Sequence, residues 1–215
     1  YCTKYNRIAY SWSGGKDSIV LQYLMDQYGI TSCVLATTDL EYPEFTRWIA
    51  NNQPSGLTII NTKQDLLWLS QHQEMLFPTE ARTSGKWFKI VQHAAQDQYF
   101  NSNRLDALIL GRRLMDGNYV GKQSNVYTTR LGITRYSPMS EWRHELVLAC
   151  IAYHDLTLPP NYYWHRGFKV GTGPWAKRRV ESTQQGWNEV FNIDPTILAD
   201  AAQYFPDAQA IIDAH

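Results

Sequence analysis

The stretch Ser13-Gly14-Gly15-Lys16-Asp17-Ser18 follows a short apolar run at residues 7–12 and leads into residues 19–25, whose apolar side chains recur at helical spacing. Glycines between a strand and a helix let backbone amides approach an anion closely. The helix N-terminus adds a partial positive charge, and Lys16 adds a full one. The stretch therefore predicts an anion-binding turn, although it lacks the spacing of a Walker A loop.

Strands and helices alternate along the chain on either side of this turn. We predict strands at 7–12, 32–37, 57–60 and 106–110, helices at 44–52, 66–69, 87–100 and 141–154, and short helices at 195–204 and 207–214. This alternation is typical of an α/β fold, here a doubly wound, mainly parallel sheet with helices on both faces. We expect a nucleotide-binding domain over residues 1–180, with a long ordered loop at 155–186, and a helical tail over residues 181–215.

Ligands of such folds bind outside the carboxyl ends of the strands. The loops at 13–18, 37–44 and 111–119 each follow a predicted strand. Because the carboxyl ends of parallel strands meet at one edge of a sheet, we expect these loops to form one cleft of the size of an adenine nucleotide.

Composition restricts the classes of function. The chain has 215 residues, with 20 Lys and Arg against 20 Asp and Glu, so its formal net charge is zero. This balance argues against binding to nucleic acid or a membrane through a large net positive charge. No run of about 18 apolar residues would span a bilayer. The first residues do not resemble a signal peptide, and we expect a cytoplasmic protein. The missing initial Met suggests that an upstream segment exists.

The three cysteines Cys2, Cys33 and Cys150 form no close pair. A disulfide framework, a zinc site and an iron–sulfur cluster held within this chain are therefore not expected.

The motif Ser-Gly-Gly-Lys-Asp-Ser after a strand resembles the pyrophosphate-binding loop, or PP-loop, of the adenine nucleotide alpha-hydrolase-like superfamily. That group includes the ATP sulfurylase small subunit, ATP pyrophosphatases and phosphoadenosine phosphosulfate (PAPS) reductases. Residues 39–44 resemble a second PAPS reductase block, D-T-G-x-x-Y/F-P-E, but Thr37 stands where that block has its acid. Gly111-Arg112-Arg113 resembles the G-x-R block, and residues 136–142 and 158–163 resemble later blocks.

The resemblance implies an adenine nucleotide, either ATP with Mg²⁺ or PAPS or adenosine phosphosulfate (APS). It implies that Lys16 and one of Arg112 and Arg113 act on the phosphates. The nucleotide would be bound by the six residues of the loop and Gly111, with ribose or magnesium roles for Asp39 and Glu41. For Asp17, a magnesium ligand and a carboxylate that complements the helix dipole are equal alternatives.

Departures from the family pattern shape the functional hypothesis. No cysteine follows Cys150, and residues 170–175 lack the Gly-Cys-x-x-Cys of many relatives. This disfavours reduction of a sulfonucleotide and favours cleavage of ATP between its α- and β-phosphates, with transfer of adenylate to an unknown acceptor. The alternatives are a non-catalytic nucleotide-binding or assembly module and a sulfonucleotide reductase whose cysteine lies outside this chain.

A basic run and two tryptophans late in the chain each have more than one interpretation. Lys177-Arg178-Arg179 could meet a second anionic group or nucleic acid, or simply form a solvated face, and Trp164 and Trp175 could stack on a base. Nucleic acid as acceptor and a homodimer are also open. The short, thiol-poor chain resembles versions carried by phages.

Overall fold

The computed structural model describes residues 5–122 and 125–215, so Cys2 and the start of the chain lie outside the described residues. The chain divides into two compact units. Unit 1 holds the described residues up to Ala36, together with Ile49–Ile60 and Ala95–Pro159. Unit 2 holds Thr37–Trp48, Asn61–Ala94 and Pro160–His215.

Unit 1 is built on a six-stranded sheet with the order β3-β2-β1-β4-β6-β5. The strands are β1 (Ile8–Ser11), β2 (Ser32–Thr37), β3 (Gly56–Asn61), β4 (Ala107–Ile109), β5 (Val126–Thr128) and β6 (Thr134–Tyr136). Strand β1 pairs in parallel with β2 and β4, and β4 pairs in parallel with β6. Strands β5 and β6 pair antiparallel. The predicted mainly parallel sheet is confirmed, whereas the β5–β6 hairpin was not foreseen.

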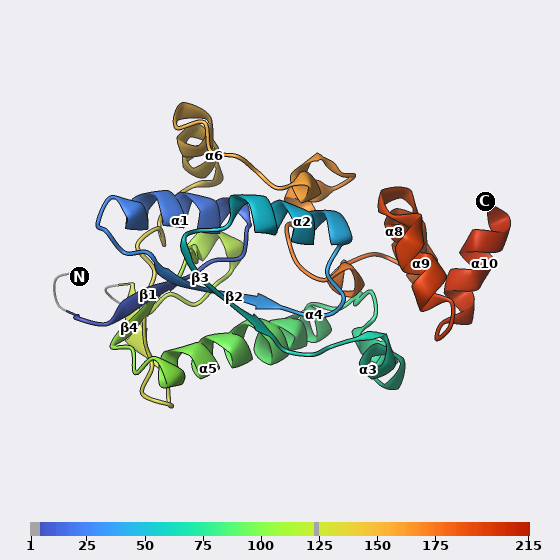
Figure 1. Cartoon of the computed structure of the whole chain (residues 1–215), viewed down its shortest axis with the longest axis horizontal. Coiled ribbons are helices and arrows are strands. Elements are labelled where there is room, and N and C mark those ends of the chain that lie inside the picture. The colour runs from blue at the N-terminus through green and yellow to red at the C-terminus, as the bar shows by residue number, and fades with distance from the viewer. Residues whose placement is uncertain (1–4, 123–124) are drawn as a thin grey trace. The chain divides into compact units, whose positions relative to one another are not determined.

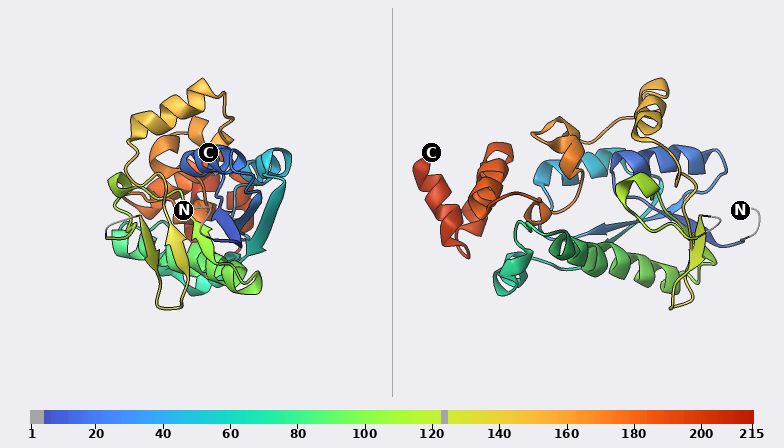
Figure 2. Two further views of the ribbon diagram at one scale, coloured as in Figure 1. Left: turned by 90° about the vertical axis from the view of Figure 1, so that its left-hand side faces the viewer. Right: turned by 180° about the vertical axis from the view of Figure 1, so that it is seen from behind.

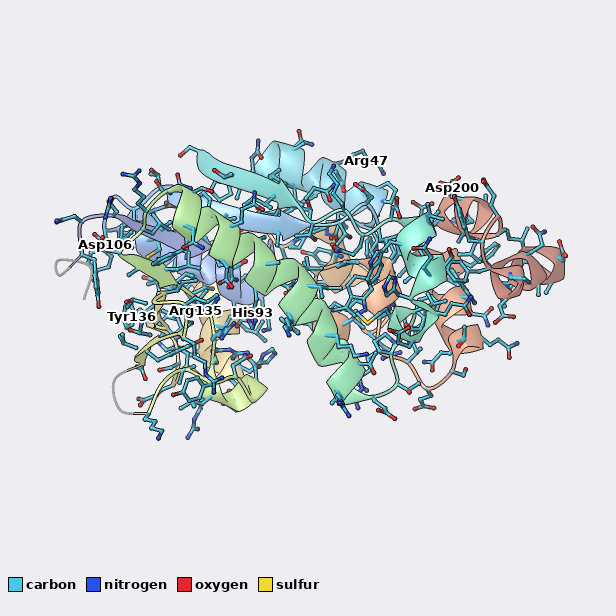
Figure 3. The ribbon with its side chains drawn as sticks, turned by 90° about the horizontal axis from the view of Figure 1, so that it is seen from below. Arg47, His93, Asp106, Arg135, Tyr136 and Asp200 are labelled. Atoms are coloured by element: carbon cyan, nitrogen blue, oxygen red, sulfur yellow. The ribbon has the colours of Figure 1, made fainter. Side chains whose placement is uncertain are left out.

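Helices lie on both faces of this sheet, as predicted. Helices α1 (Lys16–Asp26) and α5 (Ala94–Ser102) lie on opposite sides of it (Figures 1 and 2). Helix α6 (His144–Tyr153) packs against α1. A buried cluster joins the sheet to α5, because Tyr99 and Phe100 pack on the apolar side chains of Ala9, Val34, Leu108, Leu110 and Ile133. Arg135 of β6, labelled in Figure 3, forms an ion pair with Asp97 of α5 at 2.9 Å.

The sheet explains why two of the predicted loops are neighbours. Residues 13–18 follow β1, and residues 111–113 follow β4 closely. These two strands run parallel, with Tyr10 opposite Ile109. Both loops therefore leave the same edge of the sheet, at the carboxyl ends where this class of fold binds its ligands.

Unit 2 is mostly helical. It contains α3 (Leu66–Gln71), α4 (Ala81–Trp87), the π-helical turn η3 (Phe88–His93), α7 (Gly167–Val170), α8 (Thr183–Ile193), α9 (Pro195–Ala201) and α10 (Pro206–Ala214). Helix α2 (Pro43–Asn52) contributes residues to both units. Within unit 2, α8, α9 and α10 pack against one another, and the side chains of Ser182 and Asp194 cap α8 and α9.

The core of unit 2 is aromatic. Phe77, Trp175 and Trp187 contact one another, with ring centroids 4.9 to 6.1 Å apart. Trp175 is 3% exposed, so the idea that it stacks on a base is wrong, because its ring belongs to this core. Trp164 packs instead on Tyr42, at 4.7 Å.

Over the described residues, no helix is long and apolar enough to cross a membrane. Cys33 is buried and Cys150 is half-buried, and both carry free thiols.

Candidate functional site

The glycine turn forms a tight backbone loop at the start of α1. Gly14 has a φ of +65°, a conformation that glycine adopts without strain. Gly15 stands at the N-cap of α1, and no side chain caps the helix. The first-turn amides of an α-helix have no acceptor inside the helix, so this terminus offers donors and a positive dipole end to an anion.

The two serines of the turn hold its shape. The backbone N–H of Ser13 donates to the Ser18 hydroxyl at 3.0 Å, and that hydroxyl donates to the carbonyl of Gly15 at 2.9 Å. The N–H of Gly15 donates to the Ser13 hydroxyl at 3.3 Å. These bonds close the loop on itself, so Ser13 and Ser18 fix the cradle in a defined shape before any ligand binds.

Lys16 is held at the helix start by a chain of charges. Its ammonium lies 2.6 Å from Asp17 Oδ2, and the other oxygen of Asp17 lies 2.9 Å from Arg113 Nε. Lys16 and Arg113 are only 8% and 2% exposed. Asp17 thus fixes two nearly buried cations, because unpaired charges in such positions would carry a large desolvation cost.

Asp116 completes this network. Both of its carboxylate oxygens accept hydrogen bonds from the Arg113 guanidinium, at 3.0 and 2.9 Å. Through Asp17 and Asp116, Arg113 links the segment after β4 to the start of α1. Sequence reasoning missed Asp116, although its place three residues after Arg113 is a usable signal for such a pair.

A magnesium site built on Asp17 does not fit this geometry. Both carboxylate oxygens of Asp17 already face cations. Over residues 5–122 and 125–215, no group of three or more His, Cys, Asp or Glu side chains could hold a metal ion. The arrangement favours the alternative in which Asp17 complements the helix start.

The segment after β4 lies very close to the helix start. A Cβ on Gly111 would lie 3.2 Å from the carbonyl oxygen of Asp17, so glycine allows the two backbones to approach. Arg112 donates a hydrogen bond to the Tyr127 hydroxyl of β5 at 2.9 Å. Burial lowers the pKa of Arg112, which remains a cation at neutral pH. Tyr127 is a second residue that sequence reasoning missed.

The two acidic candidates lie in unit 2. Asp39 is exposed and accepts a hydrogen bond from the Asn61 side-chain amide. Glu41 accepts from the backbone N–H and the hydroxyl of Thr38, both at 3.3 Å. Burial raises the pKa of Glu41 to about 7, against the opposing effects of Thr38 and Lys177. In the sequence Lys177 is part of a basic run, and no sequence signal pairs it with Glu41.

The structure therefore gathers most predicted residues in one place. The six residues of the loop, Gly111 and Arg113 meet at the N-terminus of α1, and Arg112 leaves the same segment toward β5. Asp39 and Glu41 belong to the other unit, where they interact with their own loop, Asn61 and Lys177.

Comparison with known proteins places the chain in a family. The family model described as phosphoadenosine phosphosulfate reductase domain matches residues 7–171. The chain belongs to this family. No curated protein matches it.

Among solved structures, the fold is similar to the phosphoadenylyl-sulfate (PAPS) reductase from Candida auris in its phosphate complex. The match has a TM-score of 0.58 and 14% identity, and covers 81% of this chain and 84% of that one. A second similar structure is the U34-tRNA thiolase NcsA from Methanococcus maripaludis with its [4Fe-4S] cluster, at a TM-score of 0.47 and 12% identity, covering 94% of this chain and 71% of that one.

Proposed function

We propose that this protein binds an adenine nucleotide at residues 13–18 and cleaves ATP between its α- and β-phosphates. The observation that carries the proposal is the uncapped N-terminus of α1 behind Gly14, with Lys16 held beside it by Asp17. Membership of the PAPS reductase family supports a nucleotide as the ligand. The Candida auris reductase was solved as a phosphate complex, which is consistent with an anion site in this fold.

The chemistry follows from where charge develops. A nucleophile attacks the α-phosphorus, the bond from that phosphorus to the bridging oxygen breaks, and pyrophosphate leaves with the bonding electrons. Amides at the helix start and the Lys16 ammonium stabilise the negative charge that grows on the leaving group. An acceptor that is already an anion needs no general base, so the absence of a histidine from this set of residues does not count against the reaction.

Reduction of a sulfonucleotide is the competing function, and family membership supports it equally well. Its thiol chemistry would need a cysteine that is accessible to a mixed disulfide. Of the two described cysteines, Cys33 is buried in β2 and Cys150 is half-buried in α6. A non-catalytic nucleotide-binding module is the third candidate, and only turnover can separate it from the first.

The test measures ligand binding and product release together. Wild type, Lys16→Ala and the control Lys122→Ala, which removes an exposed lysine of unit 1, are titrated with ATP and Mg²⁺, non-hydrolysable ATP, PAPS and APS. A charged hydrogen bond is worth about 1.5–3 kcal/mol, so Lys16→Ala should weaken nucleotide binding roughly 10- to 100-fold, and the control should bind as wild type does.

Pyrophosphate release from ATP, lost in Lys16→Ala, would support the proposal. Binding of PAPS or APS alone, with thioredoxin-dependent sulfite release, would replace it with the reductase. ATP binding without pyrophosphate, for sulfate, carboxylate and nucleic-acid acceptors alike, would favour the non-catalytic module.

A further inference from the structure

Unit 2 contains a cavity of about 940 Å³, and none of the residues that line it belongs to the loop at 13–18. We propose that this cavity is a second anion site, which takes a small molecule carrying a phosphate group. Every residue that lines it belongs to unit 2. Its five basic lining residues are Arg166, Lys169, Lys177, Arg178 and Arg179.

The concentration of positive charge is the first support. The whole chain carries a formal net charge of zero, yet five of its cations line one cavity, against Glu181 as the one acidic residue of the lining. Two further carboxylates do not line the cavity but interact with cations that do. Glu189 forms ion pairs with Arg166 and Arg178, and Glu41 interacts electrostatically with Lys177. When all three carboxylates are ionised, an excess of about two positive charges remains, which matches one phosphate dianion.

Part of this charge is held rigidly. Arg178 is 2% exposed and donates from Nε and Nη2 to Glu189 Oε2, at 3.1 and 2.8 Å. Arg166 donates to the other oxygen of Glu189 at 2.5 Å. One carboxylate therefore orients two guanidiniums at the cavity wall. Arg178 and Arg166 also donate to backbone carbonyls, so they contribute a fixed positive charge to the wall and leave direct contact with a phosphate to other lining cations.

Of the other three lining cations, Lys177 interacts with Glu41 and lies over the Phe88 ring, and the other two are available to a ligand. Lys169 and Arg179 are exposed, and over the described part of the chain neither has a carboxylate at ion-pair distance. Arg179 donates a hydrogen bond from Nε to the carbonyl of Thr79 at 3.3 Å. These two side chains can turn to an anion in the cavity without breaking an ion pair.

Two glycines form part of the wall. Gly171 and Gly173 line the cavity with φ angles of +71° and +130°, which side-chain-bearing residues rarely adopt. A Cβ on Gly171 would meet no atom within 4 Å, so this glycine is required by its backbone conformation and not by crowding. The missing side chains leave this stretch of backbone open to close approach by a ligand.

The shape favours a small ligand over a nucleic acid. A volume of about 940 Å³ lies in the range of pockets that enclose small molecules and cofactors. Nucleic-acid surfaces instead spread basic residues along a stripe or face with a large net charge. The carboxylate of Glu181 in the lining would repel the further phosphates of a long polyanion.

The experiment uses the full chain and two probes, pyrophosphate and a single-stranded oligonucleotide with a 5′-phosphate. Calorimetric titrations compare wild type, Lys16→Ala, the double variant Lys169→Gln/Arg179→Gln, and all three changes combined. The matched control is Lys89→Gln/Arg104→Gln, which removes two exposed cations outside the cavity lining. Circular dichroism confirms that each variant is folded.

We expect pyrophosphate to bind Lys16→Ala at one site per chain. The cavity variant in that background should weaken this binding at least tenfold, and the control pair should leave it unchanged. Pyrophosphate binding that is unaffected by Lys169→Gln/Arg179→Gln would overturn the proposal, as would binding of the oligonucleotide alone. Because Lys16→Ala weakens binding at the nucleotide loop and the cavity variant changes no residue of that loop, failure here does not bear on ATP cleavage, and failure of ATP cleavage does not remove this site.

Discussion

Glu189→Gln tests the carboxylate that holds the cavity wall together. The substitution keeps the size of the side chain and removes its charge. Glu189 is 9% exposed and faces two guanidiniums, one of which, on Arg178, is 2% exposed. Removing one partner of a buried ion pair leaves an uncompensated charge and typically costs about 3–5 kcal/mol. Arg166, at 19% side-chain exposure, can turn to water, so its share of this cost is small.

The expected loss is large against a total free energy of unfolding of about 5–15 kcal/mol. For a chain of this size, each kcal/mol lowers the Tm by roughly 2–4 °C. We therefore expect Glu189→Gln to melt about 6–20 °C below wild type. Tryptophan fluorescence is a suitable probe, because Trp187 lies two positions from Glu189 on α8.

Glu181→Gln is the matched control, because Glu181 is exposed and surface changes of this kind shift stability by about 0.5 kcal/mol or less. The sign of the pH dependence adds a second readout. Hydrogen bonds from Arg178 and Arg166 hold the pKa of Glu189 below 4.5, against the opposing effect of burial. The ionised Glu189 carboxylate stabilises the folded state above pH 4.5. This stabilisation is lost as the pH falls through the lower pKa that Glu189 has in the folded protein. Equal melting of Glu189→Gln and Glu181→Gln at pH 7 would refute this reasoning.

Three further predictions concern backbone crowding and pH. Gly186→Ala should destabilise unit 2 although alanine favours helices by about 1 kcal/mol, because a Cβ there would overlap the Phe77 ring and overpacking costs about 1–3 kcal/mol; a rise in the Tm would contradict it. Gly111→Ala should displace the start of α1, because its Cβ would lie 3.2 Å from the Asp17 carbonyl. We therefore expect weaker nucleotide binding by calorimetry, and an unchanged affinity would contradict this prediction. Burial raises the pKa of Glu41 to about 7, so its ionisation opposes folding. As the pH rises from about 4.5 to 7, wild type should therefore lose stability relative to Glu41→Gln. Urea titrations in which both proteins show the same dependence of unfolding free energy on pH would refute this.

The sequence predicted best what depends on neighbours along the chain. The turn at 13–18 could be predicted because its glycines, lysine and serines act on the backbone within a few residues, and β2 has the predicted bounds, Ser32–Thr37. Helix α8 escaped prediction because Gly186 stands inside it, and the reason for that glycine, the Phe77 ring, lies over a hundred residues away in the chain. The core position of Trp175 was missed for the same reason.

The candidate site shows the same division. The presence of Lys16 and Arg113 near phosphate-binding loops could be inferred from their motifs, but the role of Asp17 between them depends on a contact across the sheet edge. The short strands β5 and β6 were also missed, since three residues each carry too little periodicity to predict. These strands matter for the candidate site, because β5 supplies the Tyr127 hydroxyl that accepts a hydrogen bond from Arg112.

Both units use one carboxylate to orient two cations. Asp17 does so for Lys16 and Arg113, and Glu189 does so for Arg166 and Arg178. A chain with zero net charge cannot attract anions from a distance by its overall field, so its affinity must come from cations placed before the ligand arrives. Partly buried cations need a carboxylate to be stable in the folded state, and the same carboxylate fixes their direction. Anion binding in this protein is therefore expected to depend on local geometry far more than on total charge.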